Sequence, residues 1–372
     1  MRTACITQAH FSGSPISVLN VTLDVQSPPT GCPSTGNFVA YPNPGFQQRE
    51  QGKCFVDYLN IQWDDETKIF MNATGVEVEV VNTASGTENS PLVRSLQRLL
   101  NYRVDHDLFV VSYDWRLSPN LDTVFIDRMR ATIESAYEQH QQQVFIIAHS
   151  TGGGESLYFL QSQPQQWKDK FIAGFISLSG NFAGEVDIFG DLTDLSETGF
   201  TGVTPLLSRQ FWLTQPAEIW QLPHEHIYGA QSFVFTPDYN YTTSAADILR
   251  LLSVLDAHPA LEWYHTGLWN ATGAFTAPQV NTYCLYGQGI KTLVGYVFPD
   301  NSFESNPQYL YGDGDGDQDI VTNRSCEQWA ATTEPPATFY SQGFTNVTHA
   351  EMLVNPEVLK VIVSILSGHP PH

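Results

Sequence analysis

Compact apolar runs alternate with segments of helical spacing through the middle of the chain. Three runs have the length and composition of buried strands, at residues 109–113, 144–148 and 171–178. Between and before them, apolar residues recur every three or four positions, at residues 90–100, 120–137 and 155–161. Ser90 and Pro91 supply an N-cap and first-turn pair for the first of these helices. Strands separated by helices at this spacing predict a mostly parallel sheet with crossover helices.

Two stretches interrupt this rhythm. Residues 14–60 are rich in proline, glycine and polar residues, and Cys32 and Cys54 bracket part of them, which predicts a loop-rich excursion stapled by a disulfide. Residues 185–245 contain scattered glycine, threonine, proline and tryptophan and are typical of a cap or lid insertion. Regular elements then return, as a helix at 245–255, strands at 280–286 and near Tyr309, and a closing helix at 356–366.

The length of 372 residues suits one large α/β domain with insertions. We expect a single domain over 1–372, with the excursion at 14–75 and the cap at 185–275. Lys and Arg number 17 and Asp and Glu 39, and the resulting charge of −22 gives no electrostatic footprint for nucleic acid. No apolar run reaches the roughly 18–20 residues that a membrane span requires.

Cysteines and glycosylation sequons favour the secretory route. Asn-x-Ser/Thr triplets occur at Asn20, Asn72, Asn240, Asn270, Asn323 and Asn346. The five cysteines include no Cys-x-x-Cys pair, and two bridges with one leftover thiol suit an oxidising compartment. The first 20 residues lack the apolar stretch of about 7–15 residues that a signal peptide needs, so we expect a missing or mispredicted start.

The most informative motif is the pentapeptide Ala148–Gly152, which reads Ala-His-Ser-Thr-Gly. It follows a buried strand and leads into a helix, the context of a nucleophile elbow. A sharp strand-to-helix turn requires small residues two positions from the serine, and Ala148 and Gly152 meet that requirement. We therefore expect Ser150 to be a nucleophile, with the backbone N–H of Thr151 as an oxyanion donor and the positive end of a helix from Glu155 nearby.

Downstream residues supply an acid and a base in the chain order of such enzymes. Carboxylates cluster after the strand near Tyr309, at Asp313, Asp315, Asp317 and Asp319. His349 precedes the closing helix, where a triad base belongs, whereas His369 and His372 lie in a Gly-Pro-Pro tail.

These residues resemble the lecithin:cholesterol acyltransferase and lysosomal phospholipase family. The resemblance runs from about Tyr113 to Leu366 and rests on six segments: Tyr113–Leu117, Ala148–Gly152, Leu157–Asp169, Tyr283–Gly287, Tyr311–Gly316 and His349–Leu353. The form His-x-Glu-Met-Leu is more similar to the phospholipase branch.

The resemblance implies an α/β-hydrolase fold and a role for each matching residue. The nucleophile falls on Ser150, the base on His349 and the acid on Asp315, with Asp317 or Asp319 as alternatives if the alignment shifts. It also implies Ser12 as the second oxyanion donor. Its two implied bridges are Cys32–Cys54, which closes a membrane-touching loop, and Cys284–Cys326, with Cys5 left free.

The sequence departs from the family pattern at two places near this site. Asp317-Gln318 stands where the family has Thr-Val, and Asn181–Gly184 reads Asn-Phe-Ala-Gly in place of Pro-Trp-Gly-Gly. These changes leave the acyl and headgroup preference open but not the reaction type.

The resemblance implies a serine-dependent phospholipid acyl-ester hydrolase and O-acyltransferase without a cofactor. Its acceptor is water or a lipid alcohol such as a sterol, ceramide or acylglycerol, and it acts peripherally on a membrane or lipoprotein-like surface. A lysosomal, vacuolar or extracellular location fits. The donor lipid, the ester position and the oligomeric state stay open. The alternative is an inactive secreted lipid- or calcium-binding glycoprotein with this fold.

Three other clusters favour structural interpretations. The aspartates from Asp313 to Asp319 resemble the start of a calcium loop, but Gln318 and Arg324 occupy positions where an EF-hand needs Gly and Glu. His224-Glu225-His226 has no third ligand nearby and predicts a surface turn. Asp114 and Arg116 predict a buried ion pair, and we expect no metal site.

Overall fold

The main sheet of the computed structural model contains six strands, all paired in parallel, in the order β15-β12-β9-β8-β1-β7. The structure describes residues 3–7, 17–40, 52–82, 90–195, 203–266 and 275–369. The strands are β1 (Thr3–Thr7), β7 (Leu108–Val110), β8 (Val144–His149), β9 (Ile172–Leu178), β12 (Thr282–Gln288) and β15 (Phe339–Thr345). β8 lies between β1 and β9 near the middle of the sheet, and its carboxyl end carries the nucleophile motif.

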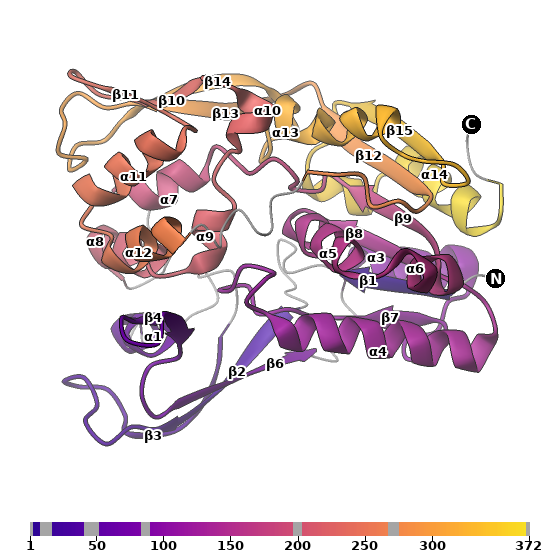
Figure 1. Ribbon diagram of the computed structural model, residues 1–372, viewed down its shortest axis with the longest axis horizontal. Coiled ribbons are helices and arrows are strands. Elements are labelled where there is room, and N and C mark those ends of the chain that lie inside the picture. The colour runs from indigo at the N-terminus through magenta and orange to yellow at the C-terminus, as the bar shows by residue number, and fades with distance from the viewer. Residues whose placement is uncertain are drawn as a thin grey trace.

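Helices cover both faces of this sheet (Figure 1). They are α3 (Pro91–Leu100), α4 (Thr123–His140), α5 (Thr151–Ser162), α6 (Gln165–Phe171) and α14 (Pro356–Leu366). Successive side chains of β8 enter different apolar clusters, because side chains alternate across a strand. Ile146 packs in the cluster that includes residues of α4 and α5, whereas Ile147 packs with residues of α3 and α14. This double burial explains why β8 reads as a continuous apolar run.

The predicted strands and helices are confirmed, with shifts of a few residues at several of their ends. α4 begins at Thr123 rather than near Asn120, because the carboxylate of Asp122 caps it by accepting a hydrogen bond from the N–H of Phe125. The strand expected at 109–113 is β7, which ends at Val110. The helix expected from Glu155 is α5, which begins at Thr151.

The stapled excursion contains more regular structure than its composition predicts. β2 (Ser17–Asp24) pairs with β3 (Thr35–Ala40) on one side and β6 (Val76–Asn82) on the other, and β4 (Gln62–Asp64) forms a hairpin with β5 (Ile69–Met71). α1 (Gly52–Leu59) contains Cys54, the second cysteine of the disulfide with Cys32. Figure 1 shows this small unit beside the main sheet, with β3 at its outer edge.

The stretch after β9 consists of short helices and a second sheet. The helices are α7 (Ile188–Thr193), α8 (Pro205–Trp212), α9 (Pro216–Trp220), α10 (Glu225–Tyr228), α11 (Ala245–Val254) and α12 (His258–Thr266). The sheet has the order β11-β10-β13-β14, from β10 (Ser232–Phe235), β11 (Asn240–Thr242), β13 (Ile290–Val297) and β14 (Gln308–Gly314). Figure 1 shows these helices beside the carboxyl ends of the main strands.

This is the α/β-hydrolase architecture that the sequence predicts. Three further short helices, α13 (Ile320–Arg324), η4 (Ser325–Ala331) and η5 (Ala350–Leu353), carry the connections after β14 and β15. Within the residues that the structure describes, no helix is long and apolar enough to cross a bilayer.

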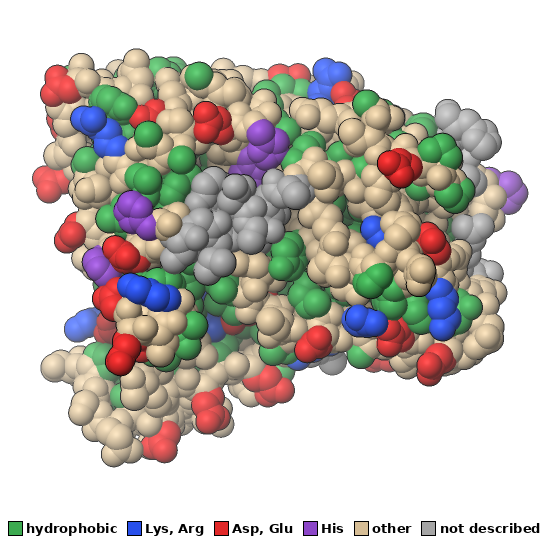
Figure 2. Space-filling view, in the orientation of Figure 1, with side chains coloured by type: hydrophobic (Ala, Val, Ile, Leu, Met, Phe, Trp, Pro, Cys, Tyr) green, Lys and Arg blue, Asp and Glu red, His purple; other side chains and the backbone are tan. Residues whose placement is uncertain are grey.

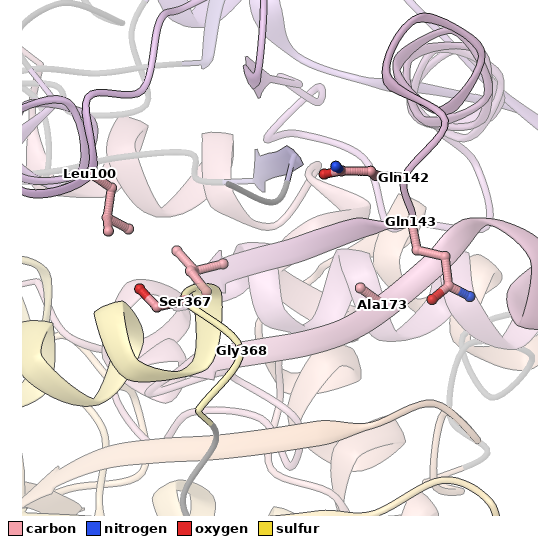
Figure 3. Close-up of a pocket in the computed structure, with 7 residues that line it drawn as sticks. Leu100, Gln142, Gln143, Ala173, Ser367 and Gly368 are labelled. Carbon is pink, nitrogen blue, oxygen red and sulfur yellow. The ribbon is translucent and has the colours of Figure 1, made fainter.

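A cavity of about 680 Å³ opens at the amino ends of the main strands (Figure 3). Its lining includes Gln143, directly before β8, and Ala173, the second residue of β9. Ser367 and Gly368, which follow α14, also line it. In open α/β sheets, ligands bind at the carboxyl ends of the strands, and this cavity lies at the opposite end.

Candidate active site

Ser150 occupies the sharp turn between β8 and α5. Its backbone has φ 57° and ψ −135°, a conformation that non-glycine residues rarely adopt. The backbone is held there because the N–H of Ser150 donates to the carbonyl oxygen of Leu178 (3.2 Å), and its own carbonyl accepts from the N–H of Asn181 (3.1 Å). This is the strained strand-to-helix turn that the sequence motif predicts.

The glycines after Thr151 allow α5 to start this close to the next strand. A Cβ on Gly153 would lie 2.6 Å from the Cα of Gly180, and a Cβ on Gly154 would lie 2.6 Å from the indole of Trp220. Neither contact tolerates a larger residue. The helix begins at Thr151, directly after the serine, so the N–H of Thr151 belongs to the first turn, whose amides have no partner within the helix.

His349 and Asp315 form a buried pair. The Nδ1 of His349 donates to the Oδ2 of Asp315 at 2.9 Å, and its backbone N–H donates to the carbonyl oxygen of Asp315 at 2.8 Å. Asp315 is 0% exposed and His349 is 6% exposed. With the proton on Nδ1, Nε2 is the ring nitrogen that can accept a proton.

His149 brings this pair to the nucleophile elbow. Its Nε2 donates to the carbonyl oxygen of His349 at 3.0 Å, and the two imidazole rings lie 4.5 Å apart between centroids. Because Ser150 directly follows His149, the pair of His349 and Asp315 lies beside the turn that carries the serine.

The two alternative acids, Asp317 and Asp319, do not contact His349 in the hydrogen bonds that the structure shows. Asp319 caps α13 by accepting hydrogen bonds from the N–H groups of Val321 and Thr322, and the hydroxyl of Tyr228 donates to its other oxygen. Asp317 is exposed. The geometry therefore favours Asp315.

The surroundings shift the pKa values of Asp315 and His349 in opposite directions, as a catalytic triad requires. Burial of the Asp315 carboxylate would raise its pKa, but His349, the amide of Gln318 and the hydroxyl of Ser179 hold that pKa below its usual value. Burial would lower the pKa of His349, but the negative charge of Asp315 and its hydrogen bond raise that pKa above the usual value, and Asp317 and Asp187 add to this effect.

The remaining predicted residues divide into three groups. Ser12 lies outside the described residues. The disulfides Cys32–Cys54 and Cys284–Cys326 are present, and Cys5 is a buried free cysteine, as the resemblance implies. Burial raises the pKa of the Cys5 thiol to about 12, so this thiol is unreactive.

The other clusters singled out in the sequence have the following places in the structure. Arg116 and Asp114 form a buried ion pair with a distance of 2.7 Å, as predicted. Across the described ranges no group of three histidine, cysteine or carboxylate side chains is arranged to hold a metal ion. Trp212, Trp220 and Trp263 are buried among core residues, and Trp269 lies outside the described ranges.

Sequence reasoning missed three polar residues that lie between the elbow and the acid. Gln221 follows α9, Asn181 and Glu185 follow β9, and all three hydrogen-bond within this region. No motif marks them, because their partners are distant in the chain. Only the unusual residues at 181–184 and 317–318 signalled a change here.

Comparison with known proteins agrees with this geometry. The family model for lecithin:cholesterol acyltransferase matches residues 53–253 and 263–356. The chain therefore belongs to the lecithin:cholesterol acyltransferase family. Phosphatidylcholine-sterol acyltransferase of Gallus gallus is 30% identical over 303 residues, which cover 74% of this chain and 69% of the relative.

Members of both family branches are among the relatives. Lysosomal phospholipase A and acyltransferase of Rattus norvegicus is 26% identical over 332 residues, covering 85% of this chain and 79% of the relative. Among solved structures, the Tle4–Tli4 complex aligns with a TM-score of 0.50 and 11% identity over 70% of this chain and 68% of the other, a likeness of fold.

Proposed function

We propose that this family member is a phospholipid acyl-ester hydrolase and O-acyltransferase in which Ser150 is the nucleophile, His349 the general base and Asp315 the acid that orients it. The observation that carries the assignment is the buried 2.9 Å contact between His349 and Asp315, which lies directly beside the strained elbow. The relatives named as acyltransferase and phospholipase A support the reaction, and none supports an inactive protein.

In the first half-reaction the Oγ of Ser150 attacks the ester carbonyl of a phospholipid while His349 Nε2 takes the hydroxyl proton. Asp315 keeps the other nitrogen protonated and stabilises the imidazolium that forms. The amide of Thr151 donates to the tetrahedral oxyanion, with Ser12 as its proposed partner. The imidazolium then protonates the departing alcohol oxygen, which leaves an acyl-enzyme and a lysophospholipid.

In the second half-reaction His349 removes a proton from the acceptor, which attacks the acyl-enzyme carbonyl. Water gives a free fatty acid, whereas a lipid alcohol gives an acylated product. Collapse of the second tetrahedral intermediate returns the proton from His349 to Ser150. The same residues therefore support hydrolysis and transfer, and the acceptor determines the product.

The experiment is an assay on phosphatidylcholine vesicles with and without a lipid alcohol. Wild-type protein is expected to release fatty acid and to divert part of the acyl chain to the alcohol. Ser150→Ala should reduce both products by at least about 10³-fold. Comparable activity in folded Ser150→Ala protein would contradict the assignment.

We also propose that the excursion binds the lipid surface. Residues 25–48 contain no charged side chain, and the region over β3 is largely uncharged in Figure 2. Ile69, Met71 and Val39 are 51%, 41% and 40% exposed. Val39 lies within the uncharged segment, whereas Ile69 and Met71 lie on the β4–β5 hairpin beside Lys68. Exposed apolar side chains favour contact with a bilayer.

Replacing Ile69 with Asp should weaken sedimentation with neutral vesicles several-fold while leaving hydrolysis of a short, soluble ester unchanged. Leu99→Asp is the matched control, because Leu99 is 46% exposed in the last turn of α3, a helix that packs in the same apolar cluster as α14. Equal loss of vesicle binding in both variants would contradict this membrane surface.

The location is a third proposal. Disulfides, sequons and relatives that include a lysosomal enzyme support the secretory route, with a lysosomal, vacuolar or extracellular destination. Treatment of the natively expressed protein with an N-glycosidase should lower its apparent mass. An unchanged mass together with free thiols at all five cysteines would contradict this route.

A further inference from the structure

A connected set of buried and half-buried polar side chains joins the two halves of the site. At one end, the hydroxyl of Thr151, next to Ser150, donates to the Oε1 of Gln221 at 2.8 Å. The same oxygen accepts from the side-chain amide of Asn181 at 3.2 Å. Gln221 is 8% exposed and Asn181 is 3% exposed. We call Asn181, Glu185, Gln221 and Gln318 the polar bridge.

The bridge continues from Gln221 to the acid. The backbone N–H of Glu185 donates to the carbonyl oxygen of Gln221 at 2.8 Å, and the side-chain amide of Gln318 donates to the Oε1 of Glu185 at 2.8 Å. The backbone N–H of Gln318 in turn donates to the Oδ1 of Asp315 at 2.8 Å. The Oδ2 of the same carboxylate accepts from His349, so the bridge reaches the catalytic pair.

Both departures from the family pattern contribute to this bridge. Gln318 belongs to the Asp-Gln pair that replaces Thr-Val, and Asn181 begins the Asn-Phe-Ala-Gly segment that replaces Pro-Trp-Gly-Gly. Neither an apolar valine nor a proline could donate these side-chain hydrogen bonds. The two changes therefore occupy one hydrogen-bonded set rather than two independent surfaces.

We propose that Gln318 and Glu185 are positioning residues, which hold the carboxylate of Asp315 at hydrogen-bonding distance from His349. Gln221 holds the side chain of Thr151 at the oxyanion site. Gln318 is 1% exposed and clasps Asp315 twice, because the N–H of Asp315 also donates to the carbonyl oxygen of Gln318 at 3.0 Å. Both contacts use the backbone of Gln318, and its side-chain amide ties this turn to Glu185. Loss of that tie is expected to loosen the turn that aims the carboxylate. This proposal rests on the proposed triad.

The charges around Glu185 are compatible with this role. The charged groups that face Glu185 are Asp187, at the start of α7, and Asp315 and Asp317, in the loop after β14. The charge of Glu185 in turn contributes to the raised pKa of Tyr228 in α10. Burial, followed by these negative charges, raises the pKa of Glu185 well above its usual value. A neutral carboxyl group retains an oxygen that accepts from Gln318.

The variants separate positioning from packing. Gln318→Leu removes the side-chain amide at similar volume, and Glu185→Leu removes its acceptor. Glu185→Gln keeps an acceptor oxygen and serves as the rescue. Gln163→Leu is the control, because this buried glutamine follows the 12-residue helix α5 and so lies about 18 Å along the helix from Ser150.

Hydrolysis of phosphatidylcholine vesicles is expected to show about a 10-fold lower kcat for Gln318→Leu and Glu185→Leu, with KM within about 2-fold of wild type, since a misplaced catalytic group affects the chemical step. The double variant should lose no more than either single variant, because both changes break one contact. Glu185→Gln and Gln163→Leu should stay within about 2-fold of wild type.

Two results would overturn the proposal. One is a wild-type kcat in folded Gln318→Leu protein; the other is a Glu185→Gln variant as impaired as Glu185→Leu. If Gln318→Leu does not fold, the pair of Glu185 variants decides. Activity that survives Ser150→Ala would instead contradict the triad, which makes the two failures distinguishable.

Discussion

At the amino ends of β8 and β9 a cavity of about 680 Å³ is lined by Gln142, Gln143, Ser367 and apolar neighbours, with no histidine or carboxylate among its lining residues. At the carboxyl ends of the same strands, Ser150 occupies a strained turn beside the buried pair of His349 and Asp315. Both ends therefore present a serine. Among the residues that the structure describes, a histidine paired with a buried carboxylate lies beside the serine at the carboxyl end, so the size of a cavity alone does not locate a candidate active site.

The largest expected effect compares a histidine at each end of the sheet. His349→Ala removes the proposed base, and we expect fatty-acid release from phosphatidylcholine vesicles to fall by at least about 10³-fold. His369→Ala, near the amino-end cavity, should stay within about 2-fold of wild type. Equal losses in the two variants would remove the distinction between the ends.

Replacing the acid is expected to be nearly as damaging and to move the pH profile. Asp315→Asn should lower kcat/KM by about 10³–10⁴-fold, because the imidazolium loses its counter-charge. Since Asp315 raises the pKa of His349 and burial lowers it, the acid limb of the residual activity should shift to lower pH. An acid limb shifted to higher pH would contradict the pairing.

Asp317→Asn is the control for that experiment. Asp317 is exposed and contributes only part of the charge that raises the pKa of His349. We expect kcat/KM within about 2-fold of wild type and a small shift of the acid limb to lower pH. A loss as large as that of Asp315→Asn would transfer the acid role to the exposed residue.

The smallest expected effect is a pH dependence of the folding stability, which comes from the buried carboxyl group of Glu155 at the carboxyl end of the sheet. Glu155, in the first half of α5, is 1% exposed, and burial followed by the charges of Asp122 and Asp114 raises its pKa well above the usual value. The folded state then binds more protons than the unfolded state above pH about 4.5, so this stability is complete below that pH and is lost as pH rises.

Thermal unfolding between pH 5 and pH 8 tests this effect. Wild-type protein should melt a few degrees lower at pH 8, and Glu155→Gln should reduce that decrease. Glu138→Gln, an exposed change of the same kind on α4, should leave it unaltered. A decrease that is identical in all three proteins would show that Glu155 does not contribute.

Much of the carboxyl end could be predicted from the sequence, because its signals are local. The elbow needs small residues around Ser150, and the helix α14 starts at Pro356 after a capping Asn355, so both are readable over a few positions. The start of α5 was less readable. Gly152, Gly153 and Gly154 are poor helix formers, and close packing against Gly180 and Trp220 explains their presence.

The polar bridge could not be predicted in the same way. Gln318 and Glu185 are 133 positions apart, and Thr151 and Gln221 are 70 apart, so each contact depends on the fold. The strands of the excursion were missed for a related reason. β3 contains Gly36 and Asn37 and follows a Pro-rich loop, and its pairing with β2 supplies the hydrogen bonds that its composition does not predict.

The most direct test of the central claim is covalent labelling with a fluorophosphonate, followed by mass spectrometry of the peptides. We expect one modified residue, Ser150, and a labelling rate that falls by at least about 10³-fold in His349→Ala. Absence of label in folded wild-type protein, or label on Ser367 at the other end of the sheet, would contradict it.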